Sequence, residues 1–428
     1  MAINIIRSEL VKPSEATPHI PFWLSNLDLG SRNSYSPMIY FFRNRSNDSL
    51  SSVDVLRTAL ARALVPFYPL AGRLSMAPDG RVEIDCNAEG AVFVVAESDL
   101  VLNDLEDFAP SKAMCDMFLP PYEKEAGAGS PLFLCQVTFI RCGGVVLGKA
   151  MHHYAVDGHS DFHFTQAWAS MARCAAGAIV PPFLDRRRLR ARSPPTIVFD
   201  HNHEYRQEVG SPTIYRPSEL TSAILRVTIV QAAALCAHTG ESLFRTLAAH
   251  IWRCTCMTRA LAPDAVSRLY TMVDMRARLS PPLPDAYFGT AAVRTSVSAK
   301  VGDLVTNPLN FSAQRIRTAT GQRDDYVRSL VDYLETADVR SKPGRELPDT
   351  DLRVISWMGM ASQDADFGWG ELALLAPAVL SYTWFIYNIG NNGDVAVAVA
   401  MKPDHLERFK ELFFDENEMA WSGLASKL

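Results

Sequence analysis

A stiff, basic segment near the middle of the chain most constrains its fold. Between Pro181 and Pro195, two proline pairs enclose five arginines. Proline stiffens the backbone and cannot continue a central strand, so the segment predicts a crossover between two separately folded parts. A chain of 428 residues is long enough for two or three domains with their own cores. We expect one domain over residues 1–180, a crossover linker over 181–210 and a second domain over 211–428.

The arginines of this segment raise the question of a nucleic-acid partner, but the overall charge argues against one. The chain has 42 Lys and Arg against 47 Asp and Glu, which gives a net charge of −5. Nucleic-acid-binding proteins usually need a basic surplus to displace counterions. An isolated arginine cluster in an acidic protein more often forms a solvated linker, and we interpret the segment in that way.

Hydrophobic patterns in the first half predict both helix and strand. Apolar residues over 53–64 recur at helical spacing up to the helix breaker Pro66. Further along, alternating residues over 133–139 and an apolar run over 145–151 flank a Cys-Gly-Gly turn at 142–144. This arrangement predicts a β-hairpin.

The rest of the chain shows the same mixture. Helical spacing predicts a helix from 164 to the stop signal Gly177 and further helices over 244–252 and 403–413. Apolar runs over 352–357 and 395–399 predict strands. The predicted fold class is therefore α/β, with two mixed β-sheets flanked by helices.

Cysteine usage and the apolar tracts indicate the compartment. Eight cysteines are thinly spread, and the close pair Cys254 and Cys256 has no matching ligand pair elsewhere, which favours buried thiols in a reduced protein. The N-terminus lacks the long apolar region of a signal peptide. The longest apolar tract, over 372–387, has 16 residues, whereas a membrane-spanning helix needs about 20. We expect a cytoplasmic protein without a membrane segment.

The densest polar cluster runs from His152 to Gly158, between the predicted hairpin and the following helix. A histidine that ends a buried strand can point into a cleft, and its ordinary pKa of about 6.5 lets it accept a proton at neutral pH. His153 is therefore a candidate general base. Asp157 either bonds the imidazole or, as we favour, braces the turn by accepting backbone N–H groups or an arginine. This segment alone leaves open the alternative that both histidines are simply polar residues at a sheet end.

Two nearby patterns begin like other catalytic sites but fit them poorly. His159 and His163 are spaced like zinc ligands, but the glutamate of the metalloprotease pattern and a third ligand are missing. The run Gly158-His-Ser-Asp-Phe162 begins like the nucleophile elbow of α/β-hydrolases, yet Phe162 replaces the second glycine. We expect neither a metal site nor a serine nucleophile.

A second cluster, from Asp364 to Gly370, has glycines on both sides of Trp369. Its formal match to a dinucleotide-binding pattern is poor, because a tryptophan stands where that pattern needs a tight turn. We interpret the cluster as a loop that presents one large ring. The carboxylate of Asp366 would then need a cationic partner such as Arg276 or Arg278.

Together, the two clusters resemble the signatures of a known family. The patterns His153-x-x-x-Asp157-Gly158 and Asp366-Phe-Gly-Trp-Gly370 are similar to the paired motifs of the plant BAHD acyltransferases. The segments 67–73, 84–90 and 281–289 also look like family blocks, so the resemblance covers the whole chain. Within the family, the chain is most similar to the hydroxycinnamoyl-CoA transferases that acylate shikimate, quinate or aromatic amines.

The resemblance implies a monomer with two chloramphenicol-acetyltransferase-like domains and a tunnel between them. Acyl-CoA would enter as co-substrate from one side and a small alcohol or amine acceptor from the other, with no permanently bound cofactor. His153 would deprotonate the acceptor, which attacks the thioester directly, while Asp157 supports the turn and Asp366 is a structural salt-bridge partner. The oxyanion donor would be the indole of Trp369 or Trp384, a backbone amide or water. The residues that bind the CoA phosphates stay unassigned.

The acceptor side departs from the family pattern. Shikimate-using members have an arginine at a position that here is Gly359, and Arg353 is another cation that could reach the site. Ser36 and Tyr40 resemble acceptor-side positions, but Met38 replaces a smaller polar residue. We therefore expect a pocket less polar than a shikimate site. Shikimate or quinate, another alcohol, an aromatic acid and an amine all stay open as acceptors.

The sequence is compatible with three alternative functions. The first is a hydroxycinnamoyl-CoA-dependent O- or N-acyltransferase. The second is a non-catalytic relative that only binds ligands, and the third is a hydrolase that releases the acyl group to water. Release of free CoA thiol separates them, because only a transferase needs the acceptor.

Overall fold

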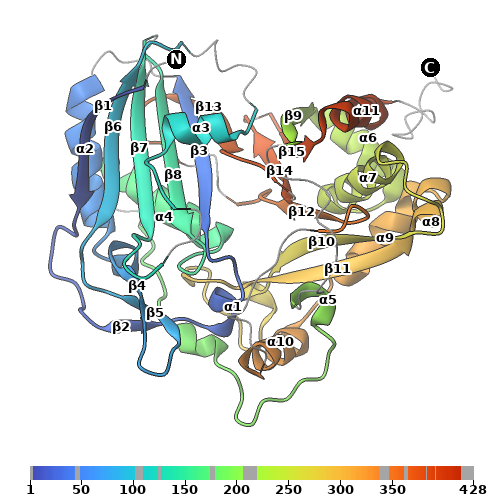
Figure 1. The fold of residues 1–428 in the computed structure, drawn as a ribbon, viewed down its shortest axis with the longest axis horizontal. Helices are drawn as coiled ribbons and strands as arrows, with labels where there is room; N and C mark the ends of the chain where they lie inside the picture. The colour runs from blue at the N-terminus through green and yellow to red at the C-terminus, as the bar shows by residue number, and fades with distance from the viewer. Residues whose placement is uncertain are drawn as a thin grey trace.

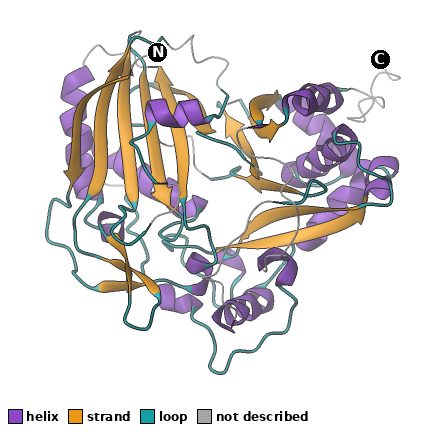
Figure 2. Ribbon diagram, in the orientation of Figure 1, coloured by secondary structure: helices purple, strands orange, loops and turns teal. Residues whose placement is uncertain are grey.

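Two six-stranded β-sheets flanked by helices form the bulk of the protein, with a small three-stranded sheet beside them (Figure 1). Figure 2 shows how strands and helices alternate across both halves. This computed structural model describes residues 3–43, 49–101, 109–123, 127–141, 143–173, 179–205, 219–336, 347–360, 365–381, 383–390 and 392–415. The predicted fold class, two mixed sheets flanked by helices, is confirmed.

The central strands of the first sheet are covered on both faces, which explains their apolar sequences. Its strands, in spatial order, are β1 (Ile3–Val11), β6 (Ala91–Ser98), β7 (Phe133–Ile140), β8 (Val145–His152), β3 (Tyr35–Arg43) and β13 (Glu371–Pro377). β6 and β7 run parallel, and the other neighbours are antiparallel. Every residue of β7 and β8 is buried. The predicted hairpin is confirmed as the β7–β8 pair; Cys142 of its turn lies outside the described residues.

Helices on the two faces of this sheet fix its packing. α2 (Ser49–Ala63) packs against α4 (Gly158–Ala172) on one face, while α3 (Lys112–Phe118) contacts β7 and β8 (Figure 1). α3 comes so close that a Cβ on Gly148 would lie 1.8 Å from the Phe118 carbonyl oxygen, so only glycine fits there. α4 begins six residues before the predicted start at 164, and the predicted stop Gly177 lies outside the described residues.

The two halves of the chain do not separate as cleanly as the sequence predicts. β13 comes from the C-terminal half, yet it pairs with β3 and completes the first sheet. Phe367 and Trp369, just before β13, belong to the first hydrophobic core. The predicted domain of residues 211–428 is therefore wrong for this stretch, because a long-range strand pair carries it into the N-terminal sheet.

One face of the second sheet packs against helices, and side chains on its other face belong to the first hydrophobic core. In spatial order its strands are β11 (Ala292–Lys300), β10 (Val266–Asp274), β12 (Leu352–Ser356), β14 (Thr383–Ile389), β15 (Asp394–Met401) and β9 (Thr221–Val227). Alternate residues face alternate sides. Val395 and Val397 join a core formed with the helices, whereas Ala396 and Ala398 join the first core. The helices of this core are α6 (Ile229–Thr239), α7 (Leu243–Thr258), α8 (Val301–Thr306), α9 (Leu309–Ala319) and α11 (Pro403–Phe414).

The crossover segment is partly built into the protein. It contains a short helix, Arg186–Leu189, and α5 (Asn202–Tyr205); residues 206–210 lie outside the described part. Arg186 is 2% exposed and forms an ion pair with Asp28 (Nη1–Oδ2 3.1 Å) on α1 (Asn26–Leu29). The other four arginines of the cluster are exposed. The interpretation as a solvated linker is therefore wrong for Arg186, which anchors the crossover to the first half.

A third core and the small sheet complete the described structure. β2 (Pro21–Trp23), β5 (Val82–Asp85) and β4 (Arg73–Met76) form the small sheet, and α10 (Asp324–Thr336) packs against α1. The six cysteines within the described ranges are free thiols, while Cys142 and Cys174 lie outside them. Across the same ranges, no helix has both the length and the apolar composition that a bilayer crossing requires.

Candidate active site

The polar turn predicted to carry chemistry lies where β8 ends and α4 begins. β8 ends at His152, and α4 begins at Gly158 with Asp157 as its N-cap. Asp157 Oδ1 accepts the backbone N–H of Ser160 (3.0 Å), which satisfies one of the free donors of the first helical turn. His153 thus stands in a short turn whose two ends are fixed by a buried strand and a capped helix.

The two adjacent histidines have opposite environments. The His152 side chain is completely buried, edge-on to the rings of Tyr35 and Tyr154 (centroids 5.2 and 5.1 Å). Burial lowers the pKa of His152 to about 3, with a smaller contribution from the nearby charge of His153, so His152 stays neutral at neutral pH. His153 is partly exposed. Of the two histidines, only His153 is accessible to solvent.

A loop from the first half holds the backbone of His153. The His153 N–H donates to the Ser34 carbonyl (3.0 Å), and the His153 carbonyl accepts from Ser31 Oγ (2.9 Å). Both bonds come from the loop between α1 and β3, so this loop is fixed to the backbone of the histidine. The sequence analysis missed this loop, because serines in a short connection carry no distinguishing signal.

Asp157 is bound to the C-terminal half of the chain through Arg276. Arg276 lies in the short helix Arg276–Arg278, after β10, and its Nη1 and Nη2 donate to the two carboxylate oxygens of Asp157 (both 2.9 Å). The N–H of Ala291 adds a third bond (3.0 Å). Burial alone would raise the pKa of Asp157, but Arg276 and the backbone donors outweigh it and bring the pKa to about 2. Asp157 is thus a carboxylate at neutral pH and joins the turn to the second half.

Asp366 has a different partner from the ones expected. Arg276 is taken by Asp157, and Arg278 donates to the Thr320 carbonyl. Asp366 instead pairs with Arg173 at the end of α4 (Oδ2–Nη1 2.6 Å), and its Oδ1 accepts the Gly368 N–H (2.8 Å). The expected partners are therefore wrong, because β13 carries Asp366 to the first sheet, where α4 ends.

The salt bridge of Asp366 is also more exposed than expected. The side chains of Arg173 and Asp366 are 38% and 45% exposed, and exposed pairs contribute about 0–1 kcal/mol. We expect Asp366→Ala to lower the free energy of unfolding by no more than about 1 kcal/mol, measured by urea denaturation. A loss of several kcal/mol would show that this carboxylate supports the loop in another way.

Trp369 is buried and does not project from its loop. It is 4% exposed and packs on Phe42 (5.2 Å) and Phe367 (5.0 Å), while Phe367 meets Trp168 of α4 (4.9 Å). Gly368 and Gly370 adopt positive φ angles of 84° and 103°, which glycine tolerates best. The expectation of a presented ring is wrong. The loop instead uses its aromatic rings to anchor β13 to the first core.

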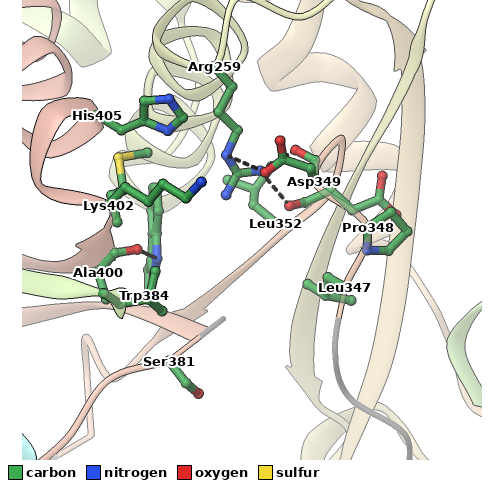
Figure 3. Close-up of a pocket in the computed structure, with 13 residues that line it drawn as sticks. Arg259, Leu347, Pro348, Asp349, Leu352, Ser381, Trp384, Ala400, Lys402 and His405 are labelled. Atoms are coloured by element: carbon green, nitrogen blue, oxygen red, sulfur yellow. Dashed lines mark hydrogen bonds and ion pairs between the residues drawn. The ribbon is translucent and has the colours of Figure 1, made fainter. Parts of the chain in front are cut away.

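Trp384 is directed away from the histidine turn. Its indole N–H donates to the Ala400 carbonyl (3.2 Å), and its ring belongs to the second core. With Arg259, Lys402 and His405 it lines a hollow at one end of the second sheet (Figure 3). The prediction that Trp384 binds substrate or donates to an oxyanion is therefore wrong, because strand alternation turns it toward the helices.

The predicted acceptor-side residues differ in accessibility. Met38 and Tyr40 on β3 are 1% and 0% exposed within the first core, whereas Ser36 on the same strand is partly exposed. Gly359 is exposed, with φ of 74° and no atom within 4 Å of a built Cβ. The next residue, Met360, lies 3.4 Å (Sδ) from the position of a Cβ on Gly158. The Gly359 segment therefore lies next to the histidine turn, but it contributes no charge there.

The other histidines of α4 do not converge. The His159 ring contacts the Asp285 carbonyl (3.0 Å), and the His163 ring contacts the Val180 carbonyl (2.8 Å). Within the described ranges, no three His, Cys, Asp or Glu side chains are grouped so that they could hold a metal ion. Each ring thus has its own backbone partner.

Comparison with known proteins places the chain among enzymes. The sequence model of the Transferase family matches residues 1–415 of this chain. The chain is 41% identical to putrescine hydroxycinnamoyltransferase 1 of Oryza sativa subsp. japonica, over 97% of this chain and 99% of the relative. It is 37% identical to shikimate O-hydroxycinnamoyltransferase of Nicotiana tabacum, over 97% of this chain and 100% of the relative.

Solved structures show the same fold at lower identity. Vinorine synthase matches with a TM-score of 0.76 and 23% identity, over 95% of this chain and 96% of that one. F. graminearum TRI101, in complex with coenzyme A and T-2 mycotoxin, matches with a TM-score of 0.77 and 16% identity, over 94% and 98%. Fold, family model and relatives together define this protein as an acyltransferase. The chain belongs to the BAHD family, as its two motifs predict.

Proposed function

We propose that this enzyme transfers a hydroxycinnamoyl group from coenzyme A to the hydroxyl or amine of a small acceptor, with His153 as the general base. The donor is suggested by relatives named for putrescine and for shikimate, which share the hydroxycinnamoyl group and differ in the acceptor. The observation that carries the proposal is the partly exposed His153 in a turn fixed from both halves of the chain, beside a histidine that is sealed from solvent.

The proposed reaction takes place in a complex of enzyme, acyl-CoA and acceptor. The acceptor O–H or N–H gives its proton to His153 while its oxygen or nitrogen attacks the thioester carbonyl carbon. The tetrahedral intermediate then collapses, the C–S bond breaks, and the departing CoA thiolate takes the proton from the imidazolium. Because a thioester is already activated, a base and correct positioning suffice, and general base catalysis supplies about 10²–10⁴-fold.

The surrounding residues are proposed to position this base. Asp157 and Arg276 hold the turn, and Asp366 with Arg173 ties the loop before β13 to the end of α4. Since Trp384 already donates its N–H to Ala400 and Trp369 is packed in the first core, a backbone amide or water is proposed as the oxyanion donor.

The test is release of free CoA thiol from p-coumaroyl-CoA, with and without an acceptor panel of shikimate, quinate, hydroxyanthranilate, tyramine, putrescine and glycerol. We expect release only with an acceptor, together with a product whose mass is the sum of acyl group and acceptor. Release without an acceptor would indicate a hydrolase. Tight binding of p-coumaroyl-CoA with no release would indicate a ligand-binding relative.

A further inference from the structure

An arginine of the crossover segment binds two carbonyls of the turn that carries His153. Arg186 Nη1 donates to the Tyr154 carbonyl (3.1 Å), and its Nη2 donates to the Ala155 carbonyl. These are the first two residues after His153. Nη1 also forms an ion pair with Asp28 (3.1 Å), and both side chains of this pair are buried. Arg186 thus contacts the turn of the proposed base from within the protein.

The same ion pair binds a backbone segment from the C-terminal half. Arg186 Nε donates to the Phe288 carbonyl (3.1 Å), and the Thr290 N–H donates to Asp28 Oδ1 (2.8 Å). A Cβ on Gly289, between them, would lie 2.8 Å from Arg186 Nε, so a glycine lets the backbone pass this close. The pair therefore joins the turn of His153 to the segment that precedes β11.

A second buried ion pair, Asp157–Arg276, binds this segment at the other end of the turn. The Gly289 carbonyl accepts from Arg276 Nη2 (2.9 Å), and the Ala291 N–H donates to Asp157 (3.0 Å). Consecutive residues over 288–291 thus bind the two pairs in alternation. The turn is held at both ends, and each end is connected to the same four residues of the second half.

The contacts of Arg186 need a guanidinium and not simply a positive charge. Arginine presents five N–H donors in fixed directions, whereas lysine has a single nitrogen. Nη1, Nη2 and Nε of Arg186 each meet a different backbone carbonyl, two in the turn and one at Phe288. A lysine would keep the charge beside Asp28 but could not reach all three carbonyls. Because buried carbonyls without a donor are costly, the turn would shift to find other donors.

We propose that Arg186 is a positioning residue for His153, so that the crossover segment takes part in catalysis. This inference rests on the proposed role of His153 as the general base. Arg186 fixes the peptide groups that follow His153 and thereby fixes where the imidazole meets the acceptor. A displacement of about 1 Å in such a group can cost about 10²-fold in rate. The contact acts on the base, so its loss falls on kcat.

The experiment is a double-mutant cycle on acceptor-dependent thiol release from p-coumaroyl-CoA, with the panel acceptor of highest turnover. Arg186→Lys and His153→Ala are assayed separately and combined, each well below its unfolding midpoint. We expect Arg186→Lys to lower kcat about 10- to 100-fold, with both KM values changed less than about threefold. In the His153→Ala background it should lower the residual rate less than about twofold, because the base it positions is already absent. The control is Arg187→Lys, the same change at an exposed neighbour, which should leave kcat unchanged.

A second variant keeps the test decisive if Arg186→Lys does not fold. Arg186→Met combined with Asp28→Asn leaves no unpaired buried charge, and the asparagine oxygen can still accept the Thr290 N–H. We expect this variant to fold and to show the same loss of kcat, again only where His153 is present. If neither variant folds, Arg186 is required for the fold itself and its assignment as a positioning residue is rejected.

The possible results separate this inference from the proposed function. Unchanged kcat in folded Arg186→Lys, or a change confined to the KM values, would overturn the inference. Equal loss of rate with and without His153 would also overturn it, because Arg186 would then act independently of the base. Thiol release by wild type without an acceptor, or near-full turnover of His153→Ala, would instead reject the proposed function, whatever the effect of Arg186→Lys.

Discussion

Replacing His153 with alanine is expected to lower acceptor-dependent release of CoA by about 10²–10⁴-fold. The thioester needs no covalent intermediate, so the proton removed by His153 is the main chemical contribution proposed for a side chain. The measurement is thiol release from p-coumaroyl-CoA at saturating acceptor, with kcat and KM separated. The loss should fall on kcat, because the imidazole acts in the transition state.

The neighbouring histidine provides a matched control for this experiment. The His152 ring is sealed from solvent and accepts the Tyr154 N–H at Nδ1 (3.2 Å). The Oδ1 atom of an asparagine would lie close to the position of Nδ1. His152→Asn should therefore keep the hydrogen bond from the Tyr154 N–H while it removes the imidazole ring. We expect this variant to keep most of its turnover. Near-full turnover in His153→Ala, with an unchanged unfolding midpoint, would reject the assigned base.

The sequence predicted the elements that depend on local patterns. The β7–β8 hairpin, α7 and α11 have strong apolar periodicity, and a proline stands in the first turn of α11, so their existence follows from nearby sequence. β13 is different. It is a short apolar strand whose partner, β3, lies more than 300 residues earlier, and no local signal encodes that pairing. The division into two sequential domains therefore failed at this strand.

The pairing of charges in the candidate site shows the same limit. The sequence indicates that Asp157 and Asp366 each accept from a partner, but it does not say which arginine serves each one. Asp366 meets Arg173 because the β3–β13 pairing brings the loop before β13 to the first sheet, whereas Arg276 reaches Asp157 from the end of β10 in the second sheet. The sequence predicts which residue types could act in the site, but it does not predict the tertiary contacts that decide which residues pair with one another.

The buried pair of Asp157 and Arg276 should be far more sensitive to mutation than the exposed pair of Asp366. The Arg276 side chain is 3% exposed, and removing one partner of a buried, hydrogen-bonded ion pair costs about 3–5 kcal/mol because the other charge stays buried alone. We expect Asp157→Ala to lower the free energy of unfolding by that amount in urea denaturation. Asp157→Ala combined with Arg276→Met should lose less than the sum of the two single changes, since no uncompensated charge is left.

The lowered pKa of Asp157 also predicts how the free energy of unfolding depends on pH. The folded pKa of Asp157, about 2, lies below the ordinary value of about 3.9 in an unfolded chain, so the folded state holds its proton less tightly. This stabilisation is complete above about pH 5 and is lost progressively as pH falls toward about 1, a contribution of about 2–3 kcal/mol. In Asp157→Asn the decline in unfolding free energy over this window should be shallower by that amount, measured against Asp366→Asn as the exposed control. An identical acid dependence in wild type and Asp157→Asn would contradict a carboxylate held in its charged form, and with it the view that this ion pair fixes the turn of His153.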